Sequence, residues 1–306
     1  MSEITPEIAF IGGGNMASAL IQGLLKAGRP PATVLVIEPD DRQRARLALQ
    51  FGVLALPFGG SSLAALPLIV WAVKPQAFAV AARHSSPHVS RALHLSVMAG
   101  IRTNAIAAAT GSARIVRAMP NTPALIGRGI AGLYATAAVS AADRTAVEQV
   151  LGGSGETMWL AQESDLDAVT ALSGSGPAYV FYFIEAMIQA AGEMGLTAEQ
   201  GRRLALATFA GATALAQQSE DSPAVLRERV TSKGGTTYAA LMSMDKDAVK
   251  AEFIRALHAA RERARQLGDE FGRETGAANG ALTAARDPAP SPQTPSPRAN
   301  GSRERP

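Results

Sequence analysis

The chain has 306 residues, of which 47% are hydrophobic and 5% aromatic, and its formal net charge is +3. A chain of this length suits two domains, and its basic residues form no stripe of the kind that binds nucleic acid. Cysteine is absent, which excludes disulfides, thiolate chemistry and cysteine-based metal sites. The apolar run at residues 63–73 is too short to span a bilayer. The N-terminus shows no signal-peptide pattern. We expect a cytoplasmic protein that binds a small molecule, and no membrane, nucleic acid or metal.

Residues 7–160 alternate between short strand-like runs and helical segments. The runs are rich in Ile and Val and are apolar throughout, which indicates parallel strands covered on both faces. They lie at residues 8–12, 34–38, 68–73, 94–99, 115–119 and 130–134. Alanine-rich helical segments separate several of them, for example residues 16–26 and 41–50. This order predicts an α/β domain with a doubly wound sheet of the Rossmann type.

The first strand runs into the pattern Gly12-x-Gly14-x-x-Ala17 and then into a helix. Gly12 permits the tight turn, Gly14 lets a pyrophosphate approach the backbone, and Ala17 lets the helix pack close to the strand. The N-terminus of the helix offers N–H groups and a partial positive charge to the phosphates. The alternative is a glycine turn without a ligand, but the strand–turn–helix context favours a dinucleotide site.

Glu38 stands at the end of the second strand, where an acid accepts hydrogen bonds from the adenosine ribose. Such an acid favours NADH, because it would repel a 2′-phosphate. However, Arg42 and Arg44 follow closely enough to contact that phosphate. The choice between NADH and NADPH therefore stays open, and a solvated strand end is the alternative interpretation of Glu38.

Later strand ends also concern the site, because ligands bind beyond the carboxyl ends of parallel strands. Lys74 follows the third strand and could face a phosphate or a ribose, or be a solvated lysine beside a proline turn. Asn121 follows the fifth and could hydrogen-bond a ligand, or form a simple asparagine turn.

Strand-like runs end after Trp159, and long helical stretches follow at residues 164–194, 197–218 and 223–266. Thr197 and Ser222 are expected to cap the second and the third stretch. Small residues and Pro177 within residues 171–179 predict a kink or a close helix crossing. The all-round apolar character of these helices suggests that a partner subunit covers them.

The last part of the chain is rich in proline, serine and arginine. From about residue 271 onward the chain has too little apolar area to offset its ordering entropy, so we expect disorder there. With a boundary near Glu163, the expected parts are a nucleotide-binding domain at residues 1–162, a helical domain at 163–270 and a disordered tail at 271–306.

The third helical stretch contains the sequence Ser232-Lys-Gly-Gly-Thr-Thr237. Gly234 and Gly235 can take backbone angles that other residues resist. Successive N–H groups then converge into an anion-binding concavity ahead of a helix that begins near Thr236. This arrangement would hold a carboxylate, and Thr237 could bond the other end of the ligand. The alternative is an ordinary helix–turn–helix in which Thr237 is a cap.

These motifs together resemble pyrroline-5-carboxylate reductase, the last enzyme of proline biosynthesis, over about residues 6–267. The resemblance rests on the segments IGGGNMA, AVKPQ, SVMAGI, RAMPNTPA, ALSGSGPAYVFYFIEAM and VTSKGGTT. It implies a Rossmann domain followed by an all-helical dimerisation domain whose helices interlock between subunits. It also implies a homodimer, assembled in some members into five dimers, and a reduced nicotinamide cofactor, NADPH or NADH.

The resemblance further implies which residues form the site. The substrate carboxylate is expected at Ser232, Gly234, Gly235 and Thr236, and the ring nitrogen at Thr237, the expected catalytic residue. Cofactor contacts are expected from Gly12, Gly14, Asn15, Met16, Glu38, Ala72, Lys74, Pro75, Ala99, Gly100, Met119, Pro120 and Asn121. The Glu38-Pro39 pair departs from the pattern of NADP-preferring members, which leaves the preference open.

The expected reaction is hydride transfer to C5 of the cyclic imine, which gives L-proline. None of the four histidines stands out as a proton donor, so the imine enters protonated or water supplies the proton. One alternative is the reduction of another imine or of a β-hydroxy acid. Enzymes of the latter kind place a lysine on the central helix, and residues 164–194 contain none. Another alternative is a nucleotide-binding regulator without turnover.

Overall fold

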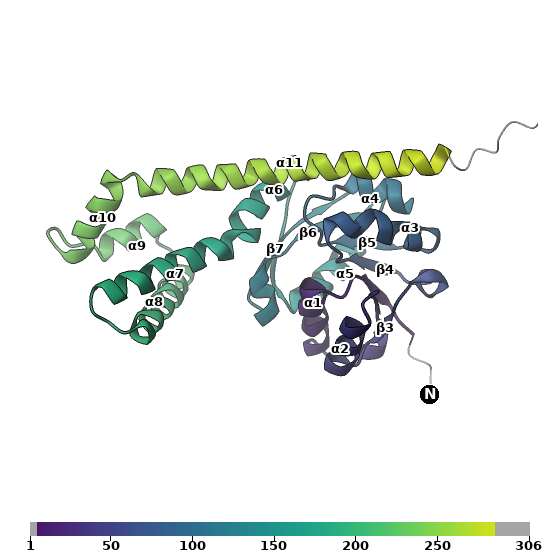
Figure 1. The fold of residues 1–306 in the computed structure, drawn as a ribbon, viewed down its shortest axis with the longest axis horizontal. Coiled ribbons are helices and arrows are strands. Elements are labelled where there is room, and N and C mark those ends of the chain that lie inside the picture. The colour runs from purple at the N-terminus through teal and green to yellow at the C-terminus, as the bar shows by residue number, and fades with distance from the viewer. Residues whose placement is uncertain (1–4, 285–306) are drawn as a thin grey trace, which may run out of the picture.

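The computed structural model describes residues 5–284, with side chains up to residue 272. Figure 1 shows two parts, a sheet covered by helices and an arm of helices beside it. The long helix α11 (Val249–Ala284) runs along both parts and joins them. Among the described residues, no helix combines the length and the apolar character needed to cross a membrane.

The first part is built on an eight-stranded sheet with the order β3-β2-β1-β4-β5-β6-β7-β8. Neighbouring strands are parallel except β6 and β7, which are antiparallel. The strands are β1 (Ile8–Ile11), β2 (Val34–Ile37), β3 (Leu54–Leu56), β4 (Leu68–Trp71), β5 (Leu93–Ser96), β6 (Ile115–Met119), β7 (Gly129–Ala135) and β8 (Gly155–Trp159). The doubly wound sheet is thus confirmed, with every predicted strand present, although β7 runs antiparallel to β6 and not parallel to it as predicted. The sequence analysis missed β3 and β8, which are short or half-exposed edge strands.

The central strands of this sheet are buried on both sides because helices cover both faces. On one face lie α1 (Asn15–Lys26), α2 (Asp41–Phe51) and α5 (Ala141–Gly152); on the other lie α3 (Phe78–Val89) and α4 (Thr103–Thr110). Short 3-10 turns connect some elements, at Pro31–Thr33, Gly60–Leu63, Pro75–Ala77 and Thr122–Ile126.

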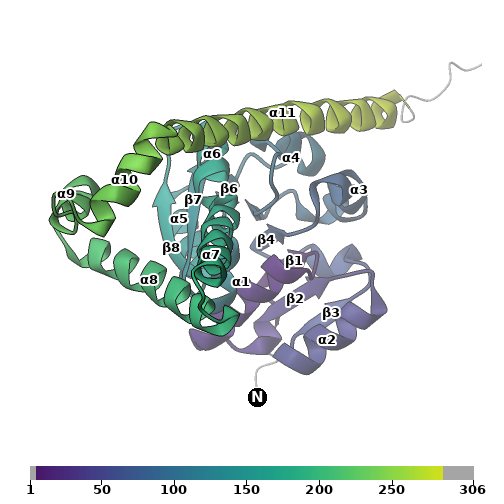
Figure 2. The same ribbon diagram turned by 60° about the vertical axis from the view of Figure 1, so that its left-hand side comes forward.

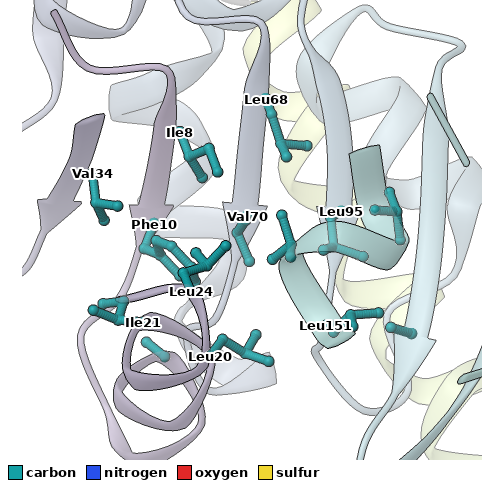
Figure 3. Packing of buried hydrophobic residues seen from close by; sticks show 14 of the residues in the cluster. Ile8, Phe10, Leu20, Ile21, Leu24, Val34, Leu68, Val70, Leu95 and Leu151 are labelled. Carbon is teal, nitrogen blue, oxygen red and sulfur yellow. The ribbon is translucent and has the colours of Figure 1, made fainter. Parts of the chain in front are cut away.

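The core follows the alternation of side chains along each strand. Ile8 and Phe10 of β1 point to the face of α1, where they meet Leu20 and Leu24 (Figure 3). Ala9 and Ile11 belong to the cluster on the opposite face. This alternation explains why the strands read as continuous apolar runs in the sequence.

The second part consists of helices only. They are α6 (Asp165–Val169), a π-helical turn at Thr170–Gly174, α7 (Gly176–Glu193), α8 (Ala198–Gln218), α9 (Pro223–Arg229), α10 (Thr236–Lys246) and α11. Thr197 and Ser222 accept the capping hydrogen bonds that the sequence predicts. The π-helical turn lies in the segment where a kink or close crossing was predicted, and such turns are frequent at functional sites.

The structure differs from the expectation of a disordered tail beginning at residue 271. Helix α11 continues to Ala284, and Phe271 is only 9% exposed within the core cluster that also contains Ile101 and Ile106. The apolar area at Phe271 and at the neighbouring Leu267 offsets the cost of ordering this turn. The remainder of the expected tail, residues 285–306, lies outside the described residues.

Candidate active site

The turn between β1 and α1 is shaped by Gly12. Its φ of +98° is in the left-handed region, and a Cβ at this position would come within 2.8 Å of the carbonyl oxygen of Ala72. Only glycine fits both conditions. Ala17 is fully buried against the sheet. The close packing of α1 on β1 that the sequence predicts is therefore present, and the contact of Gly12 with Ala72 after β4 is an addition from the structure.

The N-terminus of α1 is free of side-chain caps. Gly14 occupies the capping position without a side-chain hydrogen bond, and a Cβ added to it would meet nothing within 4 Å. Asn15 and Met16 begin the helix, with Asn15 exposed. The first turn of the helix therefore has no side-chain cap and has open space beside Gly14, which fits the pyrophosphate of a dinucleotide.

Glu38 directly follows β2 and lies beside this turn. Its Oε2 accepts a hydrogen bond from the N–H of Gly13 at 2.8 Å, and its Oε1 accepts from the N–H of Asp40 at 3.0 Å. The amide of Gln43 donates to the carbonyl oxygen of Gly13 at 2.5 Å. The carboxylate is therefore held in place at the position expected to meet the adenosine ribose.

The carboxyl ends of β4 and β5 border the same edge of the sheet. Ala72 donates its N–H to the carbonyl oxygen of Ile11 at 2.8 Å. Lys74 is exposed and precedes the 3-10 turn that begins at Pro75. Beyond β5, the partly buried Ala99 precedes Gly100, whose φ is +75°.

Gly100 also has a steric reason to be glycine. A Cβ at this position would lie 2.9 Å from Cδ2 of Phe271. The guanidinium of Arg102 lies against Gly268, where an added Cβ would come within 2.8 Å of its Nη2, and it bonds Asp269 at 3.2 Å. The middle turns of α11, around Leu267 and Phe271, thus pack directly on the loop expected to border the cofactor.

The end of β6 connects the sheet to the helical part. Met119 reaches the π-helical turn, where a Cβ on Gly174 would lie 2.5 Å from its Cε, and Pro120 is buried. Asn121 donates from Nδ2 to the hydroxyl of Ser173 at 3.1 Å and accepts from the N–H of Ile130 at 3.1 Å. Asn121 therefore braces the two parts of the chain, a function that the sequence analysis missed. Its contact with a ligand stays a prediction.

A buried ion pair strengthens the same junction. Nη1 of Arg117 donates to Oε1 of Glu163 at 2.8 Å, and this carboxylate also accepts from the N–H and the hydroxyl of Thr103, each at 2.7 Å. Burial disfavours the charge on Glu163, but Arg117 and Thr103 outweigh this effect and hold its pKa below the usual value. In the sequence, the only sign of this ion pair is Arg117, a single charged residue within the otherwise apolar strand IVRAM.

The Ser232–Thr237 loop joins α9 to α10. Gly234 has a φ of +78°, as expected for glycine. Gly235 differs from the expectation, because its φ is −82° and its constraint is steric: an added Cβ would lie 2.8 Å from the hydroxyl of Ser232. Helix α10 begins at Thr236, as predicted, and Gly235 occupies its capping position without a side-chain hydrogen bond.

This geometry leaves an open helix N-terminus in the loop. Thr237 lies in the first turn of α10 and is not its cap, so the alternative of an ordinary threonine-capped turn is absent. Ser232 and Thr236 are exposed, and Thr237 is partly buried. Uncapped N–H groups beside hydroxyls suit a carboxylate. Among the side chains that the structure describes, up to residue 272, no three from His, Asp or Glu are grouped to hold a metal ion.

The loop and the glycine turn lie apart within one chain. Figure 1 shows α9 and α10 at the end of the helical arm, away from α1, and Figure 2 shows the same separation from α1 and β1 after rotation. The arm also exposes large apolar side chains, among them Phe181 at 64% and Tyr182 at 69%. An apolar groove of about 650 Å³ runs past Asn121, Ser173 and Phe253. The two expected binding regions are therefore not brought together by a single chain.

Comparisons with known proteins match both parts of the chain. The family model described as pyrroline-5-carboxylate reductase dimerisation matches residues 163–267, and the model described as NADP oxidoreductase, coenzyme F420-dependent, matches residues 7–100. A pyrroline-5-carboxylate reductase of Pseudomonas aeruginosa is 43% identical over 265 residues, covering 86% of this chain and 97% of that protein. One from Haemophilus influenzae is 40% identical, covering 85% of this chain and 97% of the relative.

Solved structures agree with these relatives. A pyrroline-5-carboxylate reductase from Coxiella burnetii superimposes with a TM-score of 0.80 and 34% identity, covering 86% of this chain and 98% of the other. The Plasmodium falciparum pyrroline carboxylate reductase with NADP bound superimposes with a TM-score of 0.78 and 28% identity, covering 87% of this chain and 100% of the other. The two-part fold, the glycine turn and the identity over nearly the whole length of these relatives lead to one conclusion. The chain belongs to the pyrroline-5-carboxylate reductase family.

Proposed function

We propose that this protein reduces 1-pyrroline-5-carboxylate to L-proline with NADH or NADPH, as the last step of proline biosynthesis in the cytoplasm. The observation that carries this proposal is the uncapped N-terminus of α10 behind Gly234 and Gly235. A relative that is 43% identical over 265 residues is named pyrroline-5-carboxylate reductase, which is the activity proposed here. The glycine turn after β1 supplies the second half of the site.

Each binding region has a distinct task. The N–H groups and hydroxyls of Ser232, Gly234, Gly235 and Thr236 hold the carboxylate of the substrate. The hydroxyl of Thr237 bonds the ring nitrogen and orients the imine. Gly12, Gly14, Asn15 and Met16 would hold the pyrophosphate of the cofactor. The residues at the carboxyl ends of β4, β5 and β6 would hold its nicotinamide half: Ala72, Lys74, Pro75, Ala99, Gly100, Met119, Pro120 and Asn121.

The chemistry needs no protein nucleophile. When bound, the reduced nicotinamide supplies a hydride to C5 of the C=N bond, and the nitrogen takes up one proton, so that substrate, reduced cofactor and a proton give proline and oxidised cofactor. Thr237 holds the nitrogen while the loop fixes the carboxylate. Positioning of this kind accounts for most of the rate in a site that excludes water.

The complete site requires a second copy of the chain. The loop of one subunit meets the glycine turn of its partner in a homodimer, because the two regions lie apart within one chain (Figure 1). The exposed Phe181 and Tyr182 are buried in this dimer. Five such dimers form the larger assembly.

The test is an initial-rate assay of the purified protein with pyrroline-5-carboxylate and each reduced cofactor. We expect cofactor oxidation that depends on the imine, with stoichiometric L-proline as the product. Turnover of another imine or of a β-hydroxy acid, but not of pyrroline-5-carboxylate, would assign the chain to another reductase. Tight cofactor binding without any oxidation would make it a nucleotide-binding regulator.

A further inference from the structure

The second strand ends in a fixed carboxylate beside the glycine turn. Both oxygens of Glu38 are engaged, one by the N–H of Gly13 at 2.8 Å and one by the N–H of Asp40 at 3.0 Å. The side chain cannot turn away without leaving the Gly13 N–H unpaired. In folds of this type, the ribose of the adenosine lies at this position, with its 2′-oxygen toward the end of the second strand.

The helix that follows is already capped by an acid. The side chain of Asp40 accepts from the N–H of Gln43 at 2.7 Å, and Asp41 occupies the first turn of α2. An anion bound at a helix N-terminus needs its free N–H groups. At α2 one of these groups is satisfied by Asp40, and Asp40 and Asp41 bring two negative charges to the place where a 2′-phosphate would lie.

Arg44 is already engaged by groups of the β2–α2 connection. Nη1 of Arg44 donates to the carbonyl oxygens of Glu38 at 2.7 Å and of Pro39 at 2.8 Å, and Nη2 pairs with the carboxylate of Asp41. The arginine is thus used to hold the β2–α2 connection. Arg42 is exposed in the first turn of α2, and three of the four residues before it are acidic.

We propose that Glu38, supported by Asp40 and Asp41, makes this chain selective for NADH over NADPH. The inference rests on the proposed function only in so far as a nicotinamide cofactor binds to the glycine turn. Glu38 accepts a hydrogen bond from the ribose hydroxyl, while the same three carboxylates repel a 2′-phosphate that carries about two negative charges. A 2′-phosphate would also have to displace Glu38 from Gly13. The related structure with NADP bound is that of another protein, 28% identical.

The experiment measures cofactor binding and turnover separately. Dissociation constants for NADH and NADPH are obtained from nicotinamide fluorescence without substrate, and kcat/KM is measured with pyrroline-5-carboxylate at each cofactor. We expect the wild-type protein to favour NADH in both measurements. Glu38→Gln keeps the size of the side chain but removes its charge, and it should lower the NADH/NADPH ratio by about 10- to 100-fold, the range for one charged hydrogen bond and one repulsion.

Two further variants complete the design. Asp41→Asn leaves both hydrogen bonds of Glu38 intact, removes one negative charge and weakens the hold on Nη2 of Arg44. It should therefore improve NADPH binding even if Glu38→Gln folds poorly. Glu156→Gln, exposed on the edge strand β8, makes the same charge change at a distance and should leave the ratio unchanged. Tighter binding of NADPH by the wild-type protein, or equal ratios in Glu38→Gln and Glu156→Gln, would overturn the proposal. NADH selectivity in binding without imine turnover would refute the proposed function and leave this inference standing.

Discussion

Arg117 and Glu163 form a buried ion pair, with 2.8 Å between Nη1 and Oε1, at the junction of the sheet and the helical arm. Arg117 lies on β6, two residues before Met119, and Glu163 lies in the segment between β8 and α6. Through Thr103, the same carboxylate also holds the start of α4, which follows the loop at Gly100. One acidic residue thus connects two cofactor-side strand ends to the start of the helical part.

Removal of Glu163 should destabilise the protein strongly. Glu163→Ala leaves the guanidinium of Arg117, whose side chain is 7% exposed, without its charged partner. The expected loss is about 3 kcal/mol in the free energy of unfolding, because an unpaired buried charge costs more than the pair contributes. Urea denaturation followed by circular dichroism measures it. The double variant Arg117→Met with Glu163→Met should lose less than Glu163→Ala alone, and a larger loss would contradict this account.

The hydroxyl of Thr237 should matter for turnover and not for folding. Thr237→Ala is expected to lower kcat with pyrroline-5-carboxylate by about 10²-fold or less, as for the loss of one positioned hydrogen bond. Thr237→Ser keeps the hydroxyl and should retain most of the activity, with unchanged thermal stability in both variants. Wild-type steady-state rates in Thr237→Ala would remove this residue from the mechanism.

A site shared between subunits predicts complementation between two impaired variants of the chain. Gly12→Val blocks the glycine turn, where even a Cβ lies 2.8 Å from the Ala72 carbonyl oxygen, and Thr237→Ala disables the loop. When the two variants are unfolded together and refolded, half of the dimers are mixed, and each mixed dimer has one intact site. About a quarter of the wild-type activity should return. A mixture no more active than its components would place both halves of the site in one chain.

His94 should make stability depend on pH in a defined window. Burial lowers its pKa to about 4, despite the opposing hydrogen bond to the Val89 carbonyl. The indole N–H of Trp71 donates to Nδ1 of His94 at 3.0 Å, so the neutral ring is required. Below pH 6.5 His94 is protonated in the unfolded chain but stays neutral in the folded chain. The free energy of unfolding therefore falls as the pH drops from 6.5 to 4.

The size of this effect follows from the shift. The total loss in the free energy of unfolding is about 3 kcal/mol, because each pH unit between the folded and the unfolded pKa of His94 contributes 1.36 kcal/mol. Thermal unfolding of His94→Gln should show a flatter pH profile between pH 4.5 and 6.5 than the wild-type protein. His84→Gln, at an exposed position, is the matched control. A wild-type profile in His94→Gln would show that this ring does not govern the acid sensitivity.

Phe271 should contribute to the stability of the nucleotide-binding part. Its side chain is 9% exposed and packs against Gly100, so Phe271→Ala should cost about 3 kcal/mol through lost burial and a residual cavity. Phe58→Ala is the control, because Phe58 is 67% exposed. Equal unfolding midpoints for the two variants would show that the turn of α11 around Phe271 does not dock on the sheet domain.

The sequence was sufficient wherever the signal is local. The turn at Gly12, the capping residues Thr197 and Ser222, and the start of α10 at Thr236 were all predicted correctly. Each depends on residues within one turn or one strand–helix connection. The errors also have local causes, because β3 is only three residues long and Gly235 is constrained by the hydroxyl of Ser232 and not by its φ.

Contacts between distant segments escaped the sequence analysis. Asn121 reaches Ser173, Glu38 reaches Gly13, and Phe271 reaches Gly100, each across a long stretch of chain. No periodicity or spacing reports such pairs, because they arise only when the sheet brings its strand ends to one edge. The amino-acid sequence by itself determined the doubly wound sheet, the family and the two glycine-containing turns that each lead into a helix without a side-chain cap. Tertiary structure alone decided that these turns lie apart in one chain and that α11 packs on the loop at Gly100, because both depend on how rigid elements pack in space.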